Sequence, residues 1–156
     1  MKATPIIAAV LLCFVGISQS CCPPFWSQFK GQRCYRYVGI PSTWFEAREY
    51  CYHLSPGKSH LLTLNSDSEA NHIHKIFEEN GAEKHNSYWI GLHDFNKNQK
   101  VFEWDDGSVT PYTFWNTREP NNNGLEDCVE VYKLNRRWND HPCTSLKRPF
   151  FCEMEK

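Results

Sequence analysis

Residues 119–143 read EPNNNGLEDCVEVYKLNRRWNDHPC, and this stretch concentrates carboxylate and side-chain amide groups in one short part of the chain. The groups of interest belong to Glu119, Asn121, Glu126, Asp127, Asn139 and Asp140. Every side-chain ligand atom that they offer to a metal is an oxygen. Ca²⁺ takes about 6–8 oxygen ligands in proteins, whereas Zn²⁺ favours nitrogen and sulfur. The stretch therefore predicts a calcium site.

Two helices are predicted upstream of this stretch, each opened by a capping-box sequence. Thr43-x-x-Glu46 precedes one set of apolar residues at helical spacing. Ser66-x-x-Glu69 precedes a second set, and Gly81 is a favourable end for that helix. Short strands are expected at residues 35–37, 61–64, 88–92, 101–104, 129–134 and 150–154, with a long irregular stretch over 107–127. Two helices combined with many short strands indicate a single α+β domain.

The N-terminus has the pattern of a secretory signal. Lys2 is followed by an apolar run from Ile6 to Val15, and small residues stand at positions 18 and 20. We therefore expect residues 1–20 to be a signal peptide, and residues 21–156 to form the exported, extracellular domain. The apolar run is shorter than the about 20 residues that a membrane span needs, so no membrane association is expected. Lys and Arg number 17 against 18 Asp and Glu, which gives no indication of nucleic acid binding.

The chain has eight cysteines, of which Cys13 lies in the predicted signal. In an exported protein the remaining cysteines should be mostly paired, and their number is odd. The doublet Cys21-Cys22 is the natural place for the unmatched thiol, because adjacent cysteines rarely bridge each other. An interchain disulfide through Cys21, and hence a homodimer, is favoured over a mobile free thiol.

With these residues in view, the chain resembles a C-type lectin domain over Cys22 to Glu153. The resemblance is carried by Trp89-Ile90-Gly91-Leu92, Glu119-Pro120-Asn121, Glu126-Asp127-Cys128, Trp138-Asn139-Asp140 and the cysteine spacing. It implies a disulfide-stapled fold of two helices, small antiparallel sheets and a long calcium-binding loop. The bridges that it implies are Cys22–Cys34, Cys51–Cys152 and Cys128–Cys143, the first being typical of long-form domains. Small secreted invertebrate lectins are particularly similar.

The resemblance also implies that one calcium ion is held by Glu119, Asn121, Glu126, Asn139 and Asp140 together with two vicinal hydroxyls of a sugar. Each hydroxyl would give a lone pair to the ion, donate its proton to a carboxylate and accept from an amide NH₂. In this family a cis peptide bond precedes Pro120. The Glu-Pro-Asn order is similar to the mannose-type subset, which predicts mannose-type specificity. Galactose or N-acetylgalactosamine stays as the alternative, because an aromatic ring stacked on the sugar can reorient it.

A second calcium ion often lies beside the first in this family. The residues that match its site are Asp94, Asn98, Asn122 and Asp127. Two of them are asparagines where acidic residues are usual, so the charge of this second site is reduced.

Two other classes of function are alternatives to a lectin. Glu119 and Glu126 could form a glycosidase pair, but carboxylates committed to a metal cannot easily serve as acid and base. No His-Glu-x-x-His or Gly-x-Ser-x-Gly sequence occurs, so an enzyme is not expected. A structural or matrix protein of the same fold is the other alternative, but such proteins commonly lose the calcium ligands. The sequence thus predicts glycan recognition on microbial or cell surfaces, in defence or agglutination, with avidity supplied by a dimer.

Overall fold

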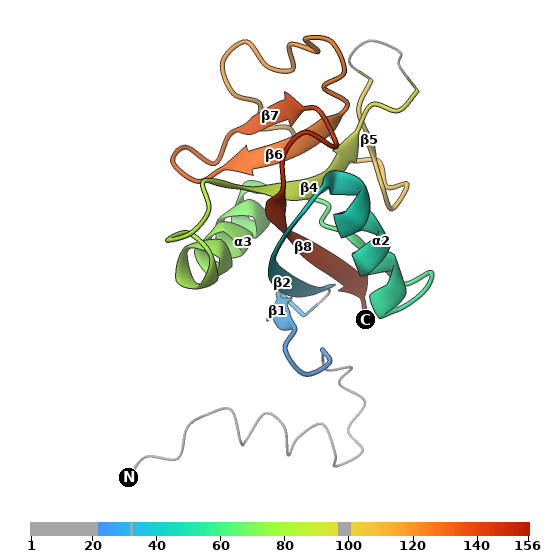
Figure 1. Cartoon of the computed structure of the whole chain (residues 1–156). Coiled ribbons are helices and arrows are strands. Elements are labelled where there is room, and N and C mark those ends of the chain that lie inside the picture. The colour runs from blue at the N-terminus through green and yellow to red at the C-terminus, as the bar shows by residue number, and fades with distance from the viewer. Residues whose placement is uncertain (1–21, 32, 97–100) are drawn as a thin grey trace, which may run out of the picture.

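The computed structural model of the chain describes residues 22–31, 33–96 and 101–156. The predicted signal peptide, Cys21 and Asn98 lie outside these ranges. Within them the chain forms two helices and eight strands (Figure 1). These are β1 (Ser27–Phe29), β2 (Arg33–Ser42), α2 (Trp44–Leu54), β3 (Ser59–Leu61), α3 (Asp67–Asn80), β4 (Ser87–His93), β5 (Glu103–Trp104), β6 (Cys128–Tyr132), β7 (Trp138–His141) and β8 (Arg148–Glu155).

Helix α2 begins with the predicted capping box. Thr43 Oγ1 accepts a hydrogen bond from the backbone N–H of Glu46 at 3.3 Å, and Glu46 Oε2 accepts from the backbone N–H of Thr43 at 2.8 Å. These two bonds satisfy donors that the first helical turn would otherwise leave without a partner. The predicted start of α2 is therefore confirmed.

Helix α3 makes only one of the two capping-box bonds. Ser66 Oγ accepts from the backbone N–H of Glu69 at 3.3 Å. The Glu69 carboxylate instead accepts from the backbone N–H of Asn65 at 2.7 Å and from the hydroxyl of Tyr35. The helix ends as predicted, where the N–H of Gly81 donates to the carbonyl of Phe77 at 2.8 Å. Glu69 therefore ties α3 to β2.

The strands join into one mixed sheet, where several small antiparallel sheets were expected. Its order is β1-β2-β8-β4-β6-β7, with β3 paired to β8 and β5 paired to β4. The junction is a parallel pairing of Trp89 on β4 with Phe150 on β8. Because this contact links segments far apart in the sequence, local patterns do not reveal it. Helices α2 and α3 flank β2 and β8 on either side (Figure 1).

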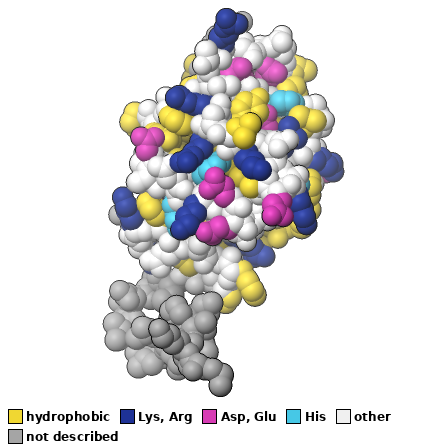
Figure 2. Space-filling model, turned by 90° about the vertical axis from the view of Figure 1, so that its left-hand side faces the viewer, with side chains coloured by type: hydrophobic (Ala, Val, Ile, Leu, Met, Phe, Trp, Pro, Cys, Tyr) yellow, Lys and Arg dark blue, Asp and Glu magenta, His cyan; other side chains and the backbone are white. Residues whose placement is uncertain are grey.

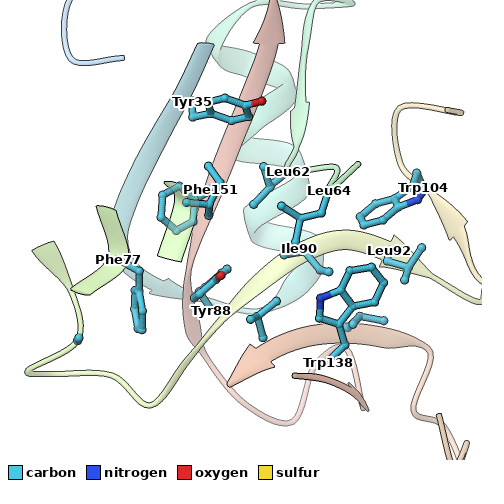
Figure 3. Close-up of a cluster of buried hydrophobic side chains, with 14 residues drawn as sticks. Tyr35, Leu62, Leu64, Phe77, Tyr88, Ile90, Leu92, Trp104, Trp138 and Phe151 are labelled. Atoms are coloured by element: carbon cyan, nitrogen blue, oxygen red, sulfur yellow. The ribbon is translucent and has the colours of Figure 1, made fainter. Parts of the chain in front are cut away.

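The core is rich in aromatic side chains, which pack around β4 and β8 (Figure 3). Trp89, Trp104 and Trp138 are all buried. The buried indole of Trp89 donates to the carbonyl of Ser42 at 2.9 Å, so its N–H is satisfied. Gly91 leaves room for a close approach, since a Cβ there would lie 2.9 Å from the Leu61 carbonyl oxygen.

Three disulfides cross-link the described residues, in the pairs that the resemblance implied: Cys22–Cys34, Cys51–Cys152 and Cys128–Cys143. The Cys51–Cys152 bridge joins α2 to β8 across a sequence separation of 101 residues. For a loop of about 100 residues the chain-entropy model gives about 4.7 kcal/mol of stabilisation. Cys128–Cys143 spans the β6–β7 hairpin and fixes its base.

The surface on the side of α3 carries Lys and Arg interleaved with Asp and Glu (Figure 2). On this face charges of both signs are mixed, whereas nucleic acid binding requires a basic patch. Among the described residues, neither helix has the length and apolar character of a membrane span.

Candidate functional site

The predicted ligand residues lie at the end of the domain that carries β6, β7 and the long preceding loop (Figure 1). Glu119 and Asn121 lie in that loop, and Glu126 precedes β6. Asn139 and Asp140 are consecutive residues of β7. The antiparallel pairing of β6 with β7 therefore brings the two halves of the ligand set to one end of the sheet.

The loop is closed on itself by hydrogen bonds among its own polar side chains. The Glu119–Pro120 peptide bond is cis, as is expected for the family. Glu119 Oε2 accepts from the backbone N–H and from Nδ2 of Asn121, at 3.1 and 2.6 Å. The backbone N–H of Asn123 donates to Asn121 Oδ1 at 2.8 Å and to Glu126 Oε2 at 3.0 Å. Glu119, Asn121 and Glu126 are thus connected within one short loop.

Asp140 fastens this loop to the sheet. Its side chain is fully buried, and its two carboxylate oxygens accept from the backbone N–H groups of Asn121 at 3.1 Å and Asn122 at 2.6 Å. Four of the five predicted ligand residues are consequently held together by hydrogen bonds. The fifth, Asn139, is the neighbour of Asp140 on β7.

The electrostatics of the site favour a cation. Burial raises the pKa of Glu119, and the adjacent Asp140 carboxyl raises it further through a hydrogen bond and through charge. Two carboxyl groups held this close repel each other when both are ionised, and a divalent ion between them would relieve that repulsion. The donor set therefore fits a hard, oxygen-binding ion such as Ca²⁺. In the part of the chain that the structure describes, no three His, Cys, Asp or Glu side chains converge as a metal cluster, so the amide oxygens of Asn121 and Asn139 would be needed as ligands.

One residue of the site was missed by sequence reasoning. Glu130 on β6 is 1% exposed and stands opposite Asn139 in the β6–β7 register. Asn139 Nδ2 donates to Glu130 Oε1 at 3.3 Å. The sequence signal that could have found it is a carboxylate between two core valines, Val129 and Val131.

The residues proposed for a second ion are also adjacent where the structure describes them. Asp94 is buried, and its Oδ2 accepts from Asn122 Nδ2 at 3.4 Å. The backbone N–H of Asp94 donates to the carbonyl of Asp127 at 2.9 Å. Asn122 therefore lies between the two predicted sites, because its backbone N–H also donates to Asp140.

An aromatic cleft of about 620 Å³ adjoins the loop at Pro120. Its lining includes Phe102, Tyr112, Trp115 and Trp138. Trp115 is only partly buried, and its ring centroid lies 5.6 Å from that of Trp138. An aromatic surface is therefore present next to the predicted ligands.

Comparison with known protein sequences finds one matching family and several similar proteins. The family described as "Lectin C-type domain" matches residues 40–154. Echinoidin from Heliocidaris crassispina is 32% identical over 86% of this chain and 97% of its own length. The C-type mannose receptor 2 of Mus musculus is 38% identical over 85% of this chain, which spans only 8% of the receptor's length. A C-type lectin galactose-binding isoform of Hoplocephalus stephensii is 35% identical over 88% of this chain and 86% of its own.

Solved structures similar to this chain also include C-type lectins. The C-type lectin CEL-I from Cucumaria echinata superimposes with a TM-score of 0.78 at 28% identity, covering 85% of this chain and 96% of CEL-I. A calcium-independent type II antifreeze protein superimposes with a TM-score of 0.74 at 25% identity, covering 87% of this chain and 96% of its own.

The expectation that the chain is not an enzyme is confirmed, because its family and structural neighbours such as CEL-I are lectins rather than enzymes. The long-form disulfides, the two flanking helices and the match over residues 40–154 together show that the chain belongs to the C-type lectin family.

Proposed function

We propose that this protein is a calcium-dependent lectin that binds sugars of the mannose type. The residues that would hold the ion are Glu119, Asn121, Glu126, Asn139 and Asp140. When bound, the ion would accept lone pairs from two vicinal sugar hydroxyls. One observation supports the proposal most strongly. Asp140 on β7 accepts hydrogen bonds from the backbone N–H groups of Asn121 and Asn122, and these bonds keep the loop with Glu119 and Asn121 next to β7, which carries Asn139 and Asp140.

The side chains themselves would supply the polar contacts to the sugar. A carboxylate accepts a hydroxyl proton, whereas an amide NH₂ donates to the hydroxyl oxygen. Glu119 and Asn121 form one such pair, and Glu126 and Asn139 form the other. Each hydroxyl of a vicinal pair would thus meet one acceptor and one donor, in addition to the ion.

The Glu-Pro-Asn order supports mannose-type specificity, and the match to a mannose receptor domain agrees with it. Galactose or N-acetylgalactosamine binding is the second candidate. It is favoured by the aromatic cleft beside Pro120, which offers rings against which a sugar face can stack, and by the likeness to a galactose-binding isoform.

We also propose that the protein is exported and that it forms a disulfide-linked dimer. Residues 1–20 have the signal pattern, and three disulfides are typical of an oxidising compartment. A disulfide between the Cys21 residues of two copies would place two sugar sites on one molecule. Because a single shallow site binds weakly, such pairing would raise avidity for glycans on microbial or cell surfaces.

The test is retention on immobilised mannose and, in parallel, on immobilised galactose, in millimolar Ca²⁺ followed by a chelator. We expect retention on mannose and release by the chelator. Glu126→Gln should abolish retention because it removes a carboxylate from the site, while Glu49→Gln on the exposed face of α2 should not. Retention on galactose alone would overturn the specificity but keep the mechanism. A lack of retention on both sugars would favour a binding protein that does not recognise sugar.

A further inference from the structure

Glu130 is a buried carboxylate whose hydrogen bonds connect three strands beside the proposed site. It lies on β6, and its Oε2 accepts from Ser87 Oγ on β4 at 2.6 Å and from Arg148 Nε on β8 at 2.8 Å. Its other oxygen, Oε1, accepts from Asn139 Nδ2 on β7 at 3.3 Å. With two donors on Oε2, only Oε1 is left to face Asn139.

This contact decides which way the Asn139 amide is turned. A side-chain amide has an acceptor oxygen on one side and a donor NH₂ on the other. Because Nδ2 faces Glu130, Oδ1 is directed away from Glu130. The NH₂ group carries two protons, and the bond to Glu130 uses one of them. The second proton stays available to another acceptor.

We propose that Glu130 is a positioning residue that fixes Asn139 with its oxygen toward the calcium ion and one N–H toward a sugar hydroxyl. The inference rests on the proposed function for the role of Asn139 as a ligand. Arg148 completes the arrangement, since it neutralises a carboxylate that is 1% exposed and can only donate to it. A buried charge without such a partner would be strongly unfavourable.

The variant Glu130→Gln tests the proposal, because it keeps the shape of the side chain and changes its hydrogen bonding. Arg148 has no acceptor atom, so it would take the oxygen of the introduced amide and leave the NH₂ group of that amide facing Asn139. Two NH₂ groups cannot bond to each other, and Asn139 should therefore turn its oxygen away from the ion. We expect calcium affinity, measured by titration calorimetry, to fall about 10–100-fold, as for other residues that orient metal ligands. Unchanged affinity would overturn the proposal.

The double variant Glu130→Gln, Asn139→Asp separates positioning from a general loss of structure. A carboxylate at position 139 would accept from the amide introduced at position 130 with one oxygen and keep the other for the ion. Calcium affinity should therefore recover relative to the single variant. Retention on mannose should stay impaired, because a carboxylate has no N–H to donate to a sugar hydroxyl. A double variant that binds calcium no better than Glu130→Gln would contradict the inference.

The matched control is Glu69→Gln, which changes another buried carboxylate with several donors on it. Glu69 is 5% exposed and accepts from Tyr35 and Asn65, far in sequence from the ligand residues. This variant is expected to lower the thermal midpoint without changing calcium affinity. If Glu69→Gln and Glu130→Gln lost calcium affinity equally, replacing any buried carboxylate by an amide would weaken calcium binding. That result would overturn the proposal.

A spectroscopic readout makes the inference independent of calcium binding. The side-chain NH₂ signals of Asn139 can be assigned in an amide correlation spectrum by their loss in Asn139→Asp. In the wild type one of the two protons should exchange slowly with water, and this protection should disappear in Glu130→Gln. If the wild type bound neither calcium nor mannose, the proposed function would fail. The protection would still decide whether Glu130 fixes the amide, and equal protection in both proteins would show that it does not.

Discussion

Asn121 donates both its backbone N–H and its Nδ2 to one oxygen of Glu119, so these two side chains behave as a single donor–acceptor pair. Their order along the chain sets on which side of a bound sugar hydroxyl the acceptor carboxylate and the donor amide would lie. The pair itself does not depend on that order, because a glutamine at 119 could donate to an aspartate at 121.

The exchange Glu119→Gln with Asn121→Asp should therefore alter specificity while the loop keeps its shape. We expect retention on mannose to be lost and retention on galactose to appear. The measurement is parallel chromatography on both sugars in Ca²⁺, with the thermal midpoint as a check that folding is unchanged. A doubly substituted protein that still prefers mannose would show that other residues, such as those of the aromatic cleft, determine specificity.

Glu153 is a buried acid on β8. It is 4% exposed, and Arg33 Nη1 lies 3.3 Å from its Oε2. Burial raises the pKa of Glu153 well above 4.5, and the opposing influence of Arg33 is smaller. The folded chain therefore binds a proton at this position more tightly than the unfolded chain does.

The sign of the resulting pH dependence follows from linkage. As the pH rises from about 4.5, the pKa of an unfolded glutamate, toward the higher folded value, Glu153 should make the folded state progressively less stable. Glu153→Gln cannot lose a proton, so its stability relative to the wild type should increase across this window. Urea unfolding of both proteins from about pH 4.5 to about pH 7.5, in chelator, measures the difference. A difference independent of pH would contradict the assignment.

At the scale of helices and strands, the capping box of α2 gives a direct test of a local signal. Thr43→Ala removes the acceptor for the Glu46 N–H and should lower the free energy of unfolding by about 1 kcal/mol. Thr43→Ser keeps the hydroxyl and is the control, with little expected loss. Urea midpoints compare the three proteins. Equal midpoints for Ala and Ser would mean that the packing of α2, rather than its cap, determines where the helix begins.

Local signals account for much of the fold because they act within a few residues. The helix starts at Thr43 and Ser66 and the end at Gly81 were predicted from capping chemistry. The strand expected over 101–104 is only Glu103–Trp104, and Leu134 is an exposed turn residue rather than part of a strand. Apolar residues near a strand end do not reveal where pairing stops, since that depends on the partner strand.

Sheet order explains what the sequence did not reveal at the site. The proposed ligand residues were recognisable because they match the motifs of the C-type lectin family. The hydrogen-bond partners of Glu130 were not recognisable, because Ser87 and Arg148 come from β4 and β8, which are joined by a parallel pairing of residues far apart in the sequence. The contact of Glu130 with Asn139 likewise depends on the β6–β7 register.

At the scale of the whole molecule, the disulfides and a bound metal ion would stabilise different parts of the domain. The Cys51–Cys152 bridge joins α2 to β8 at the C-terminus. In the 119–126 loop no residue is buried, and hydrogen bonds to Asp140 fasten the loop to β7. An ion bound by Glu119, Asn121 and Asp140 would add a second fastening there. Because such an ion binds only the folded state, it should stabilise the folded domain.

Calcium removal should therefore lower the thermal midpoint. At a free calcium concentration about 100 times the dissociation constant, the stabilisation would be about 2.7 kcal/mol, which corresponds to a midpoint shift of several degrees for a domain of this size. Scanning calorimetry in Ca²⁺ and in chelator measures the shift, which should be absent in Glu126→Gln. Mg²⁺ should not replace Ca²⁺, because it demands near-octahedral geometry and loses water reluctantly. If Ca²⁺ raised the midpoints of wild type and Glu126→Gln equally, the stabilising ion would not depend on Glu126, and the proposed set of Glu119, Asn121, Glu126, Asn139 and Asp140 would be wrong.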